Sequence, residues 1–187
     1  MIETERLLLR PPRASDIAAL IRYYSENREH LTPWEPAWPE GFLTERFWHA
    51  QLAHQQEQAR SGGALRLLMF KRGERRTVIG SINFTAIQRG AQQGCVLGYS
   101  LAEAEQGKGY MTEALRAALA YVFEELRLHR VMANYIPRNV RSGRLLGRLG
   151  FVIEGYARDY LLVNGRWEDH VLTSLVRTSD LMKLLDA

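Results

Sequence analysis

The chain has 187 residues, of which 46% are hydrophobic and 25% charged, and its 25 basic and 21 acidic residues leave a formal net charge of +4. This length and composition are typical of one globular unit, so residues 1–187 are expected to form a single domain. The charge excess is too small for a dedicated nucleic-acid-binding protein, although it suits an anionic ligand. No apolar run approaches the roughly 20 residues of a membrane span. The single cysteine, Cys95, cannot form an internal disulfide, and we expect a cytoplasmic protein.

The first half of the chain predicts a strand, two helices and three further strands. The first strand, at 5–12, ends at two prolines, which cannot donate to a strand ladder. Ser15 or Asp16 is expected to cap the first helix, and a more polar helix follows at 43–60. Strands predicted at 64–72, 77–87 and 95–101 are joined by short turns, which favours antiparallel pairing.

The second half predicts a helix from about Met111 to Leu126, a strand at 130–136, a short helix at 140–150 and two strands turned at Asn164-Gly165. This order indicates a mixed α/β fold, in which one right-handed parallel crossover joins the 95–101 strand to the 130–136 strand. The carboxyl ends of both strands should then lie beside the start of the central helix. Its expected buried stripe is Leu115, Ala118, Leu119, Val122 and Phe123.

The segment Gln106–Thr112 places two glycines directly before the central helix. The first backbone N–H groups of a helix lack internal partners and carry partial positive charge. Gly107 and Gly109 let an anion approach them, while Lys108 adds a charge and Thr112 a hydroxyl, so a pyrophosphate is a natural ligand. An ordinary glycine turn is the alternative. Neither the Walker P-loop pattern nor the Rossmann pattern fits these residues.

The string instead matches Q/R-x-x-G-x-G/A at its first four positions, with Met111 where the sixth position has glycine or alanine. It resembles the coenzyme A loop of the GCN5-related N-acetyltransferases. The stretches TERLLLRPPRASD, LGYSL, NVRSGRLLGRLGF and YLLVNGRWEDHVLTSL occur in the expected order. Together they resemble the RimJ/RimL branch, and most closely its RimJ type, from about Glu3 to Val176. The resemblance implies a mixed, mostly antiparallel sheet flanked by helices.

The resemblance also implies where acetyl-CoA binds. Its pantetheine arm would lie along the 97–101 strand, and its pyrophosphate would sit on the 106–112 amides. Asn139 would reach the pantetheine amides, and Ser142 would lie near the thioester sulfur. The expected binding residues are Leu97, Gly98, Tyr99, Ser100, Leu101, Gln106, Gly107, Lys108, Gly109, Tyr110, Met111, Thr112, Asn139 and Ser142.

Acetyl transfer to an amine needs a proton acceptor for the amine and a proton donor for the departing thiolate. We expect Glu103 to accept the proton, with Glu105 or water as the alternative. Ser142 is the expected partner of the thiolate, and Tyr135 is the alternative acid.

The acceptor implied by the RimJ type is the N-terminal alanine or serine amine of a ribosomal protein, on the ribosome or on its assembly intermediates. Direct attack would occur in a ternary complex. Trp34, Glu35 and Trp38 would line the acceptor side, with Glu35 holding the amine, unless the tryptophans only pack over the helices. The alternatives are a small-molecule acceptor, such as an antibiotic or polyamine, and a coenzyme-A-binding or ribosome-assembly factor. The five histidines lack metal-ligand spacing, so no metal is expected. Nucleic-acid contact would be incidental.

Overall fold

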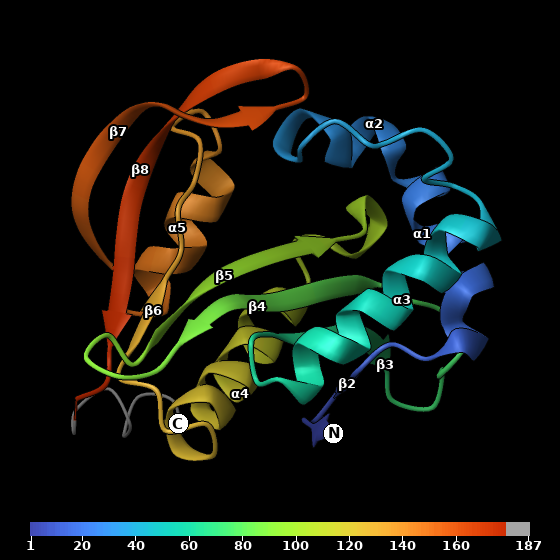
Figure 1. The fold of residues 1–187 in the computed structure, drawn as a ribbon, viewed down its shortest axis with the longest axis horizontal. Coiled ribbons are helices and arrows are strands. Elements are labelled where there is room, and N and C mark those ends of the chain that lie inside the picture. Colours follow the sequence, from blue (N-terminus) through green and yellow to red (C-terminus); the bar gives the residue numbers. More distant parts are fainter. Residues whose placement is uncertain (179–187) are drawn as a thin grey trace.

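The computed structural model describes residues 1–178, which form one eight-stranded sheet with helices on both faces (Figure 1). No helix in this described part of the chain is long and apolar enough to cross a membrane. The elements are β1 (Ile2–Glu3), β2 (Leu7–Arg10), η1 (Ala14–Asp16), α1 (Ile17–Glu26), α2 (Arg28–Leu31), η2 (Thr32–Trp34), α3 (Glu45–Arg60), β3 (Leu65–Lys71), β4 (Gly80–Gln88), β5 (Gly94–Leu101), η3 (Glu103–Glu105), α4 (Tyr110–Glu124), β6 (Arg130–Met132), α5 (Val140–Arg148), β7 (Val152–Val163) and β8 (Arg166–Val176).

The strands follow the order β1-β2-β3-β4-β5-β6-β8-β7. Every neighbouring pair is antiparallel except β5 and β6, which are parallel and are joined through α4. The expected mixed, mostly antiparallel sheet with one parallel crossover is therefore confirmed.

Two hydrophobic clusters hold the helices against the sheet. One cluster joins α4 and α5 to one face and contains all five residues of the predicted α4 stripe, each fully buried. The other cluster joins α1 and α3 to the opposite face. The alternation along the strands fixes this division, because successive residues point to opposite faces: Leu67 belongs to the first cluster and Leu68 to the second.

The central strands separate at the carboxyl end of β5. Pairing between β5 and β6 stops at Val96 and Met132, whereas pairing between β5 and β4 continues to Leu101. Residues 97–101 consequently have a hydrogen-bonded strand neighbour on one side only. The V-shaped gap lies directly before the loop that leads into α4.

The strand predicted at 130–136 is shorter in the structure and ends at Met132. The chain beyond it stays with β8, since the Ala133 N–H donates to the Thr173 carbonyl at 3.0 Å and Tyr135 forms an isolated bridge with Val171. These bonds to β8 direct the segment away from β5, which explains why the sheet opens here.

Asp16 occupies the N-cap position of α1, as predicted, but its side chain does not bond to the helix. The Asp16 carboxylate instead accepts the Arg13 N–H at 2.7 Å and pairs with both terminal nitrogens of Arg10 at 2.7 Å. Burial alone would raise the pKa of Asp16, but these hydrogen bonds and charges outweigh it and lower the pKa. Asp16 therefore joins β2 to the start of α1.

Candidate active site

The loop before α4 has a backbone shape that favours glycine. Gly107 and Gly109 have φ angles of +75° and +81°, in the left-handed region that costs other residues about 1–2 kcal/mol. Gly109 directly precedes α4, and no side chain caps this helix. A Cβ at Gly107 would meet nothing within 4 Å, so the space beside that residue is open.

The backbone N–H groups of this loop are available for a ligand. The Gln106 N–H donates to the Glu103 carbonyl, and the Glu113 N–H donates to the Gly109 carbonyl, each at 3.1 Å. Between them, no backbone N–H of residues 107–112 has a hydrogen-bond acceptor within residues 1–178. These amides surround the positive end of α4, which is the environment that a phosphate group prefers.

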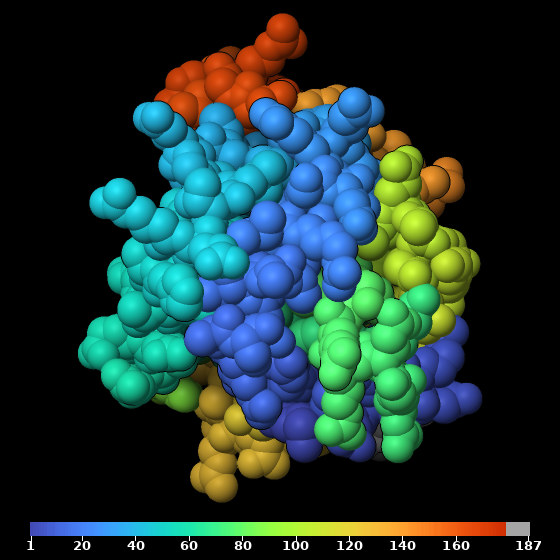
Figure 2. All heavy atoms as spheres, turned by 90° about the vertical axis from the view of Figure 1, so that its right-hand side faces the viewer, coloured from blue at the N-terminus to red at the C-terminus, as the bar shows by residue number. Residues whose placement is uncertain are grey.

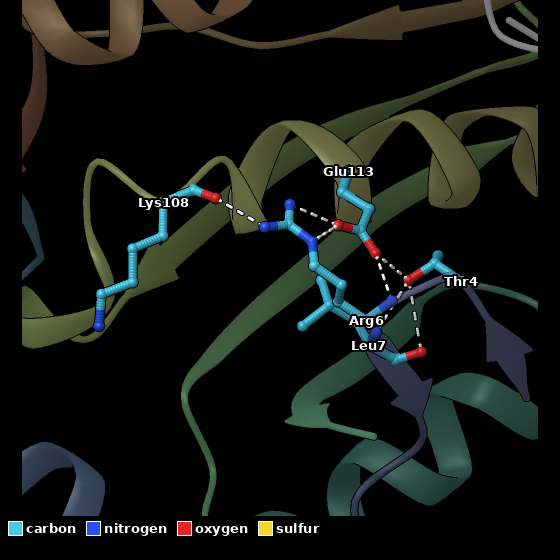
Figure 3. A network of polar contacts seen from close by, with 5 residues as sticks. All are labelled: Thr4, Arg6, Leu7, Lys108 and Glu113. Atoms are coloured by element: carbon cyan, nitrogen blue, oxygen red, sulfur yellow. Dashed lines mark hydrogen bonds and ion pairs between the residues drawn. The ribbon is translucent and has the colours of Figure 1, made fainter. Parts of the chain in front are cut away.

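One carboxylate fixes the start of α4 to the amino-terminal segment (Figure 3). Glu113 accepts hydrogen bonds from the Thr4 hydroxyl at 2.6 Å, the Arg6 N–H at 2.9 Å and the Arg6 Nε at 2.6 Å. Arg6 also donates to the Lys108 carbonyl at 2.9 Å. Burial alone would raise the pKa of Glu113, but the bonds from Thr4 and Arg6 outweigh it and lower the pKa.

Sequence reasoning missed both Arg6 and Glu113. An acidic residue in the first helical turn indicates only a favourable interaction with the helix dipole. At an anion site, however, an unpaired carboxylate there would repel the ligand. Arg6 neutralises this charge and holds the loop by its Lys108 carbonyl, so the pair positions the loop.

The two candidate proton acceptors have different surroundings. Glu105 contacts the Nζ atoms of Lys71 at 2.6 Å and Lys108 at 3.0 Å. Although burial alone would raise the pKa of Glu105, these lysines outweigh it and lower the pKa, which makes Glu105 a weaker base. The exposed Glu103 side chain has no hydrogen-bond or ion-pair partner in the described residues, while its N–H donates to Asn27 Oδ1 at 2.9 Å.

The other loop residues have structural partners. The Gln106 amide contacts Nε2 of His30 at 2.8 Å and also the Arg141 guanidinium, so it connects α2 with α5. Tyr110 lies 4.7 Å below the Arg6 guanidinium. Met111 is 7% exposed and belongs to the α4 core, which explains an apolar side chain at the one misfitting position of the motif. Thr112 is half-buried in the first turn of α4.

The unpaired edge of β5 divides its side chains between the two faces of the sheet. Leu97, Tyr99 and Leu101 pack on the α4 side, and Gly98 and Ser100 lie on the α1 side. Gly98 is exposed, and a Cβ there would meet nothing within 4 Å, so another chain can approach this backbone closely.

A pair of hydroxyl groups spans the gap between β5 and α5. Tyr99 Oη and Ser142 Oγ share a hydrogen bond of 2.7 Å. Burial raises the pKa of Tyr99 to about 12, so its hydroxyl is protonated at neutral pH. Ser142 is held in the first turn of α5, where its N–H donates to Asn139 Oδ1 at 3.1 Å. The sequence predicted that Asn139 and Ser142 both lie at the acetyl-CoA site. Tyr99 was among the predicted binding residues, but no role was predicted for the Tyr99 hydroxyl.

Tyr135, the alternative acid, packs on α5. A Cβ added to Gly143 would lie 2.8 Å from the Tyr135 ring, so this glycine lets the ring lie against the helix. Tyr135 is part of the border of the α4 core. Its hydroxyl has no hydrogen-bond partner in residues 1–178, and nothing in its contacts favours it over Ser142.

The three predicted acceptor-side residues make two separate sets of contacts. Trp34 lies 5.2 Å below the Arg138 guanidinium, whereas Trp38 stacks on Phe42 at 4.6 Å. Trp38 Nε1 donates to Glu35 Oε2 at 2.9 Å, and burial raises the pKa of Glu35.

The backbone of Glu35 contacts the β7–β8 turn. The Asn164 N–H donates to the Glu35 carbonyl at 3.0 Å. The space-filling view shows this turn, in red, lying over the segment around residues 30–40, in light blue (Figure 2). The β7–β8 turn therefore bridges the gap between β5 and β6 on this side.

A further hydroxyl cluster lies on the α1 side of β5. Tyr23 Oη donates to Ser100 Oγ at 2.9 Å, and Ser100 Oγ lies 3.1 Å from Ser81 Oγ. Polar groups therefore line the α1 face of the sheet next to the unpaired β5 edge.

This fold and this loop define an acyl-CoA-binding transferase, and comparison with known proteins identifies the family. Residues 6–152 match the acetyltransferase (GNAT) domain. The chain belongs to the GCN5-related N-acetyltransferases, as its sequence predicted.

Two kinds of relatives make the assignment more specific. Over 174 residues the chain is 46% identical to the ribosomal protein uS5-alanine N-acetyltransferase of Escherichia coli, covering 93% of this chain and 89% of that protein. The ribosomal-protein-S5-alanine acetyltransferase structure from Vibrio fischeri has a TM-score of 0.89 at 37% identity, with 95% and 96% coverage. RimJ of Mycobacterium smegmatis, solved in complex with a CoA-disulfide, has a TM-score of 0.87 at 30% identity, with 96% and 88% coverage.

No group of three or more His, Cys, Asp or Glu side chains suited to a metal ion occurs within residues 1–178. That the reaction needs no metal stays a prediction.

Proposed function

We propose that the protein transfers the acetyl group of acetyl-CoA to the N-terminal α-amine, of alanine or serine, of a ribosomal protein in the cytoplasm. The unpaired amides of residues 107–112 beside the open β5 edge carry this proposal, because they offer acetyl-CoA both an anion site and a strand edge. Similarity to the uS5-alanine enzymes over nearly the whole chain supports the acceptor. The reaction takes place on the ribosome or on its assembly intermediates.

In this proposal, residues 97–101 pair with the pantetheine arm as an added strand would, and the 107–112 amides bind the pyrophosphate. The Asn139 side-chain oxygen already caps α5, which leaves its amide nitrogen to donate to pantetheine. Lys108 stands at the rim of the loop, where its ammonium group adds positive charge. Both substrates bind before transfer, and the amine attacks the thioester directly.

The α-amine has a pKa of roughly 7.7–8.0 in solution, so losing one proton makes it a nucleophile. Glu103 accepts this proton, directly or through water, because its carboxylate is free while that of Glu105 is held by two lysines. Glu35, half-buried on the acceptor side, holds the amine before transfer.

The departing thiolate needs a hydrogen-bond donor. Ser142 supplies it, and the Tyr99 hydroxyl supports Ser142 through the hydrogen bond that the two groups share. Because the pKa of Tyr99 is high, its hydroxyl stays protonated and can donate to Ser142 while Ser142 donates to the thiolate. The attacking nitrogen loses a second proton as the amide forms, and this proton neutralises the thiolate.

The proposal can be tested with an eight-residue peptide that carries the uS5 N-terminus. Purified protein and acetyl-CoA should add one acetyl group to its α-amine, as followed by mass spectrometry, and a polyamine should stay unmodified. Preferential acetylation of the polyamine would instead establish a small-molecule acceptor.

Glu103→Gln tests the assigned base, with Glu105→Gln as its matched control in the same turn. We expect Glu103→Gln to lower kcat at least tenfold with acetyl-CoA affinity within about twofold, since base catalysis contributes about 10²–10⁴-fold. Glu105→Gln should instead weaken acetyl-CoA binding by loosening Lys108. A kcat unchanged in Glu103→Gln would exclude this role.

A further inference from the structure

A small cavity lies between the sheet and the helices α1 and α3, away from the acetyl-CoA loop. Its volume is about 40 Å³, and its polar and aromatic lining consists of Tyr24, Trp48, Gln55, Arg66, Ser81 and Asn83. None of the acidic residues in the described part of the chain lines this cavity.

Two hydrogen-bond donors on this lining are buried without partners. Arg66 Nη1 and Trp48 Nε1 have no acceptor within residues 1–178, and Trp48 is only 5% exposed. The one other such side-chain atom in residues 1–178, Gln58 Oε1, belongs to a residue that does not line the cavity. Buried donors without acceptors are rare in native proteins because each one loses its hydrogen bonds to water.

The charge of Arg66 is also uncompensated. Burial lowers the pKa of Arg66, and no carboxylate opposes this effect. Arg10, a second arginine on the same side of the sheet, is matched instead by two oxygens of Asp16. Arg66 and Trp48 both line this cavity, and a guanidinium and an indole N–H on one lining can be satisfied together by the two oxygens of a carboxylate.

The cavity lies next to the acceptor side of the proposed active site. Arg66 pairs with Asn83 in the sheet register, and Asn83 pairs with Gly98 on the open β5 edge. The three residues form one row on one face, so Arg66 lies two strand spacings, or about 10 Å, from that edge. Asn83 donates to Ser81 at 3.5 Å, and Ser81 contacts Ser100 on β5. Polar side chains therefore lie between Arg66 and the open β5 edge.

We propose that Arg66 and Trp48 form a subsite for a carboxylate side chain of the acceptor, close to its acetylated N-terminus. This inference rests on the proposed function. An extended peptide advances about 3.3–3.6 Å per residue, so about 10 Å corresponds to an aspartate or glutamate near the third position. The subsite selects acceptor proteins that are acidic at that point.

The test uses alanine-initiated peptides built on one neutral scaffold. One series carries a single glutamate at the second, third or fourth position, and the matched series carries glutamine there. Values of kcat and KM are measured for the wild-type protein, Arg66→Gln and Arg66→Lys. Arg60→Gln is the control, because the Arg60 side chain is 75% exposed on α3 and its one ion pair among the described residues is with Glu57.

For one of the three positions we expect the glutamate peptide to have at least a tenfold higher kcat/KM than its glutamine partner, through a lower KM. Arg66→Gln should remove this preference and Arg66→Lys should retain part of it. Arg60→Gln should retain all of it, with kcat on glutamine peptides unchanged. Acetyl-CoA affinity should be the same in all four proteins.

The wild-type peptide series decides the question even if Arg66→Gln does not fold. Equal kcat/KM for glutamate and glutamine peptides at all three positions would overturn the subsite, as would a preference that persists in Arg66→Gln. If acetyl-CoA binds but no peptide is acetylated, the proposed acceptor is wrong and the subsite falls with it. Acetylation without acidic preference would refute the subsite alone.

Discussion

Replacing Gly107 with alanine tests whether the amides before α4 bind the pyrophosphate. The substitution has two separable effects: backbone strain at φ +75°, and a methyl group on the open side of the loop. Gly62→Ala is a matched control. Gly62 has φ +73°, a Cβ there would also meet nothing within 4 Å, and it lies in the turn after α3.

The strain should be equal in the two variants, at about 1–2 kcal/mol. In a domain of this size, a loss of 1 kcal/mol lowers Tm by about 2–4 °C. Only Gly107→Ala should affect the ligand, because its methyl group would stand where a phosphate oxygen approaches the amides. Losing one hydrogen bond to a charged group costs about 1.5–3 kcal/mol, which corresponds to roughly a 10- to 100-fold higher Kd for acetyl-CoA.

Calorimetric titration with acetyl-CoA measures the Kd of wild type and both variants, and thermal unfolding without ligand measures the strain. The expected result is a matched fall in Tm, with weaker binding in Gly107→Ala alone. If both variants bound acetyl-CoA as tightly as wild type, the pyrophosphate would not lie on these amides, and the assignment of the loop would be wrong.

Two further substitutions test stability and proton transfer. Asp16→Asn breaks a buried ion pair with Arg10 and should lower the free energy of unfolding by about 3–5 kcal/mol at pH 7, measured by urea denaturation. Because the folded-state pKa of Asp16 is lowered, its stabilisation is complete above the unfolded pKa of about 3.9 and is lost as the pH falls through the folded value. The difference in the free energy of unfolding between wild type and Asp16→Asn should thus become smaller in strong acid. A difference that stays constant down to pH 2 would contradict this account. Tyr99→Phe keeps the ring but removes the hydroxyl bonded to Ser142, so kcat should fall about tenfold with KM for acetyl-CoA nearly unchanged. An unaltered kcat would exclude the Tyr99 hydroxyl from stabilising the departing thiolate.

The main elements could be predicted because their signals are local. The spacing of apolar residues identified α4, and short turns between apolar runs identified the antiparallel strands β3, β4 and β5. The helix α2, only Arg28–Leu31, escaped prediction because four residues show no periodicity. The early end of β6 also could not be inferred, since it depends on bonds to β8, about 40 residues further along the chain.

The candidate site also divides into residues with a local signal and residues whose partners are distant in the sequence. Gly107 and Gly109 were recognisable because their residue type reflects local backbone shape. Glu113, by contrast, is bound by Arg6, which lies 107 residues earlier in the chain. The Tyr99–Ser142 contact spans 43 residues and depends on how β5 and α5 are placed. No pattern within one segment encodes such partners.

The single crossover from β5 through α4 to β6 explains why the anion loop and the open strand edge occur together. The loop follows β5 directly, so a ligand bound to the α4 amides extends naturally along residues 97–101. Tyr99 and Ser142 flank this edge on the α4 side, while Ser100 and Tyr23 flank it on the other.

Two substrates can therefore approach one edge from opposite faces of the sheet, which direct transfer requires. The alternative, a covalent acetyl-cysteine, has no suitable nucleophile. Cys95 is the only cysteine of the chain, it is fully buried on β5, and burial raises the pKa of its thiol to about 12. A thiol that is neither exposed nor ionised cannot attack a thioester at neutral pH. The burial and high pKa of Cys95 therefore favour the proposed direct transfer, in which the cosubstrate and the amine are bound at the same time.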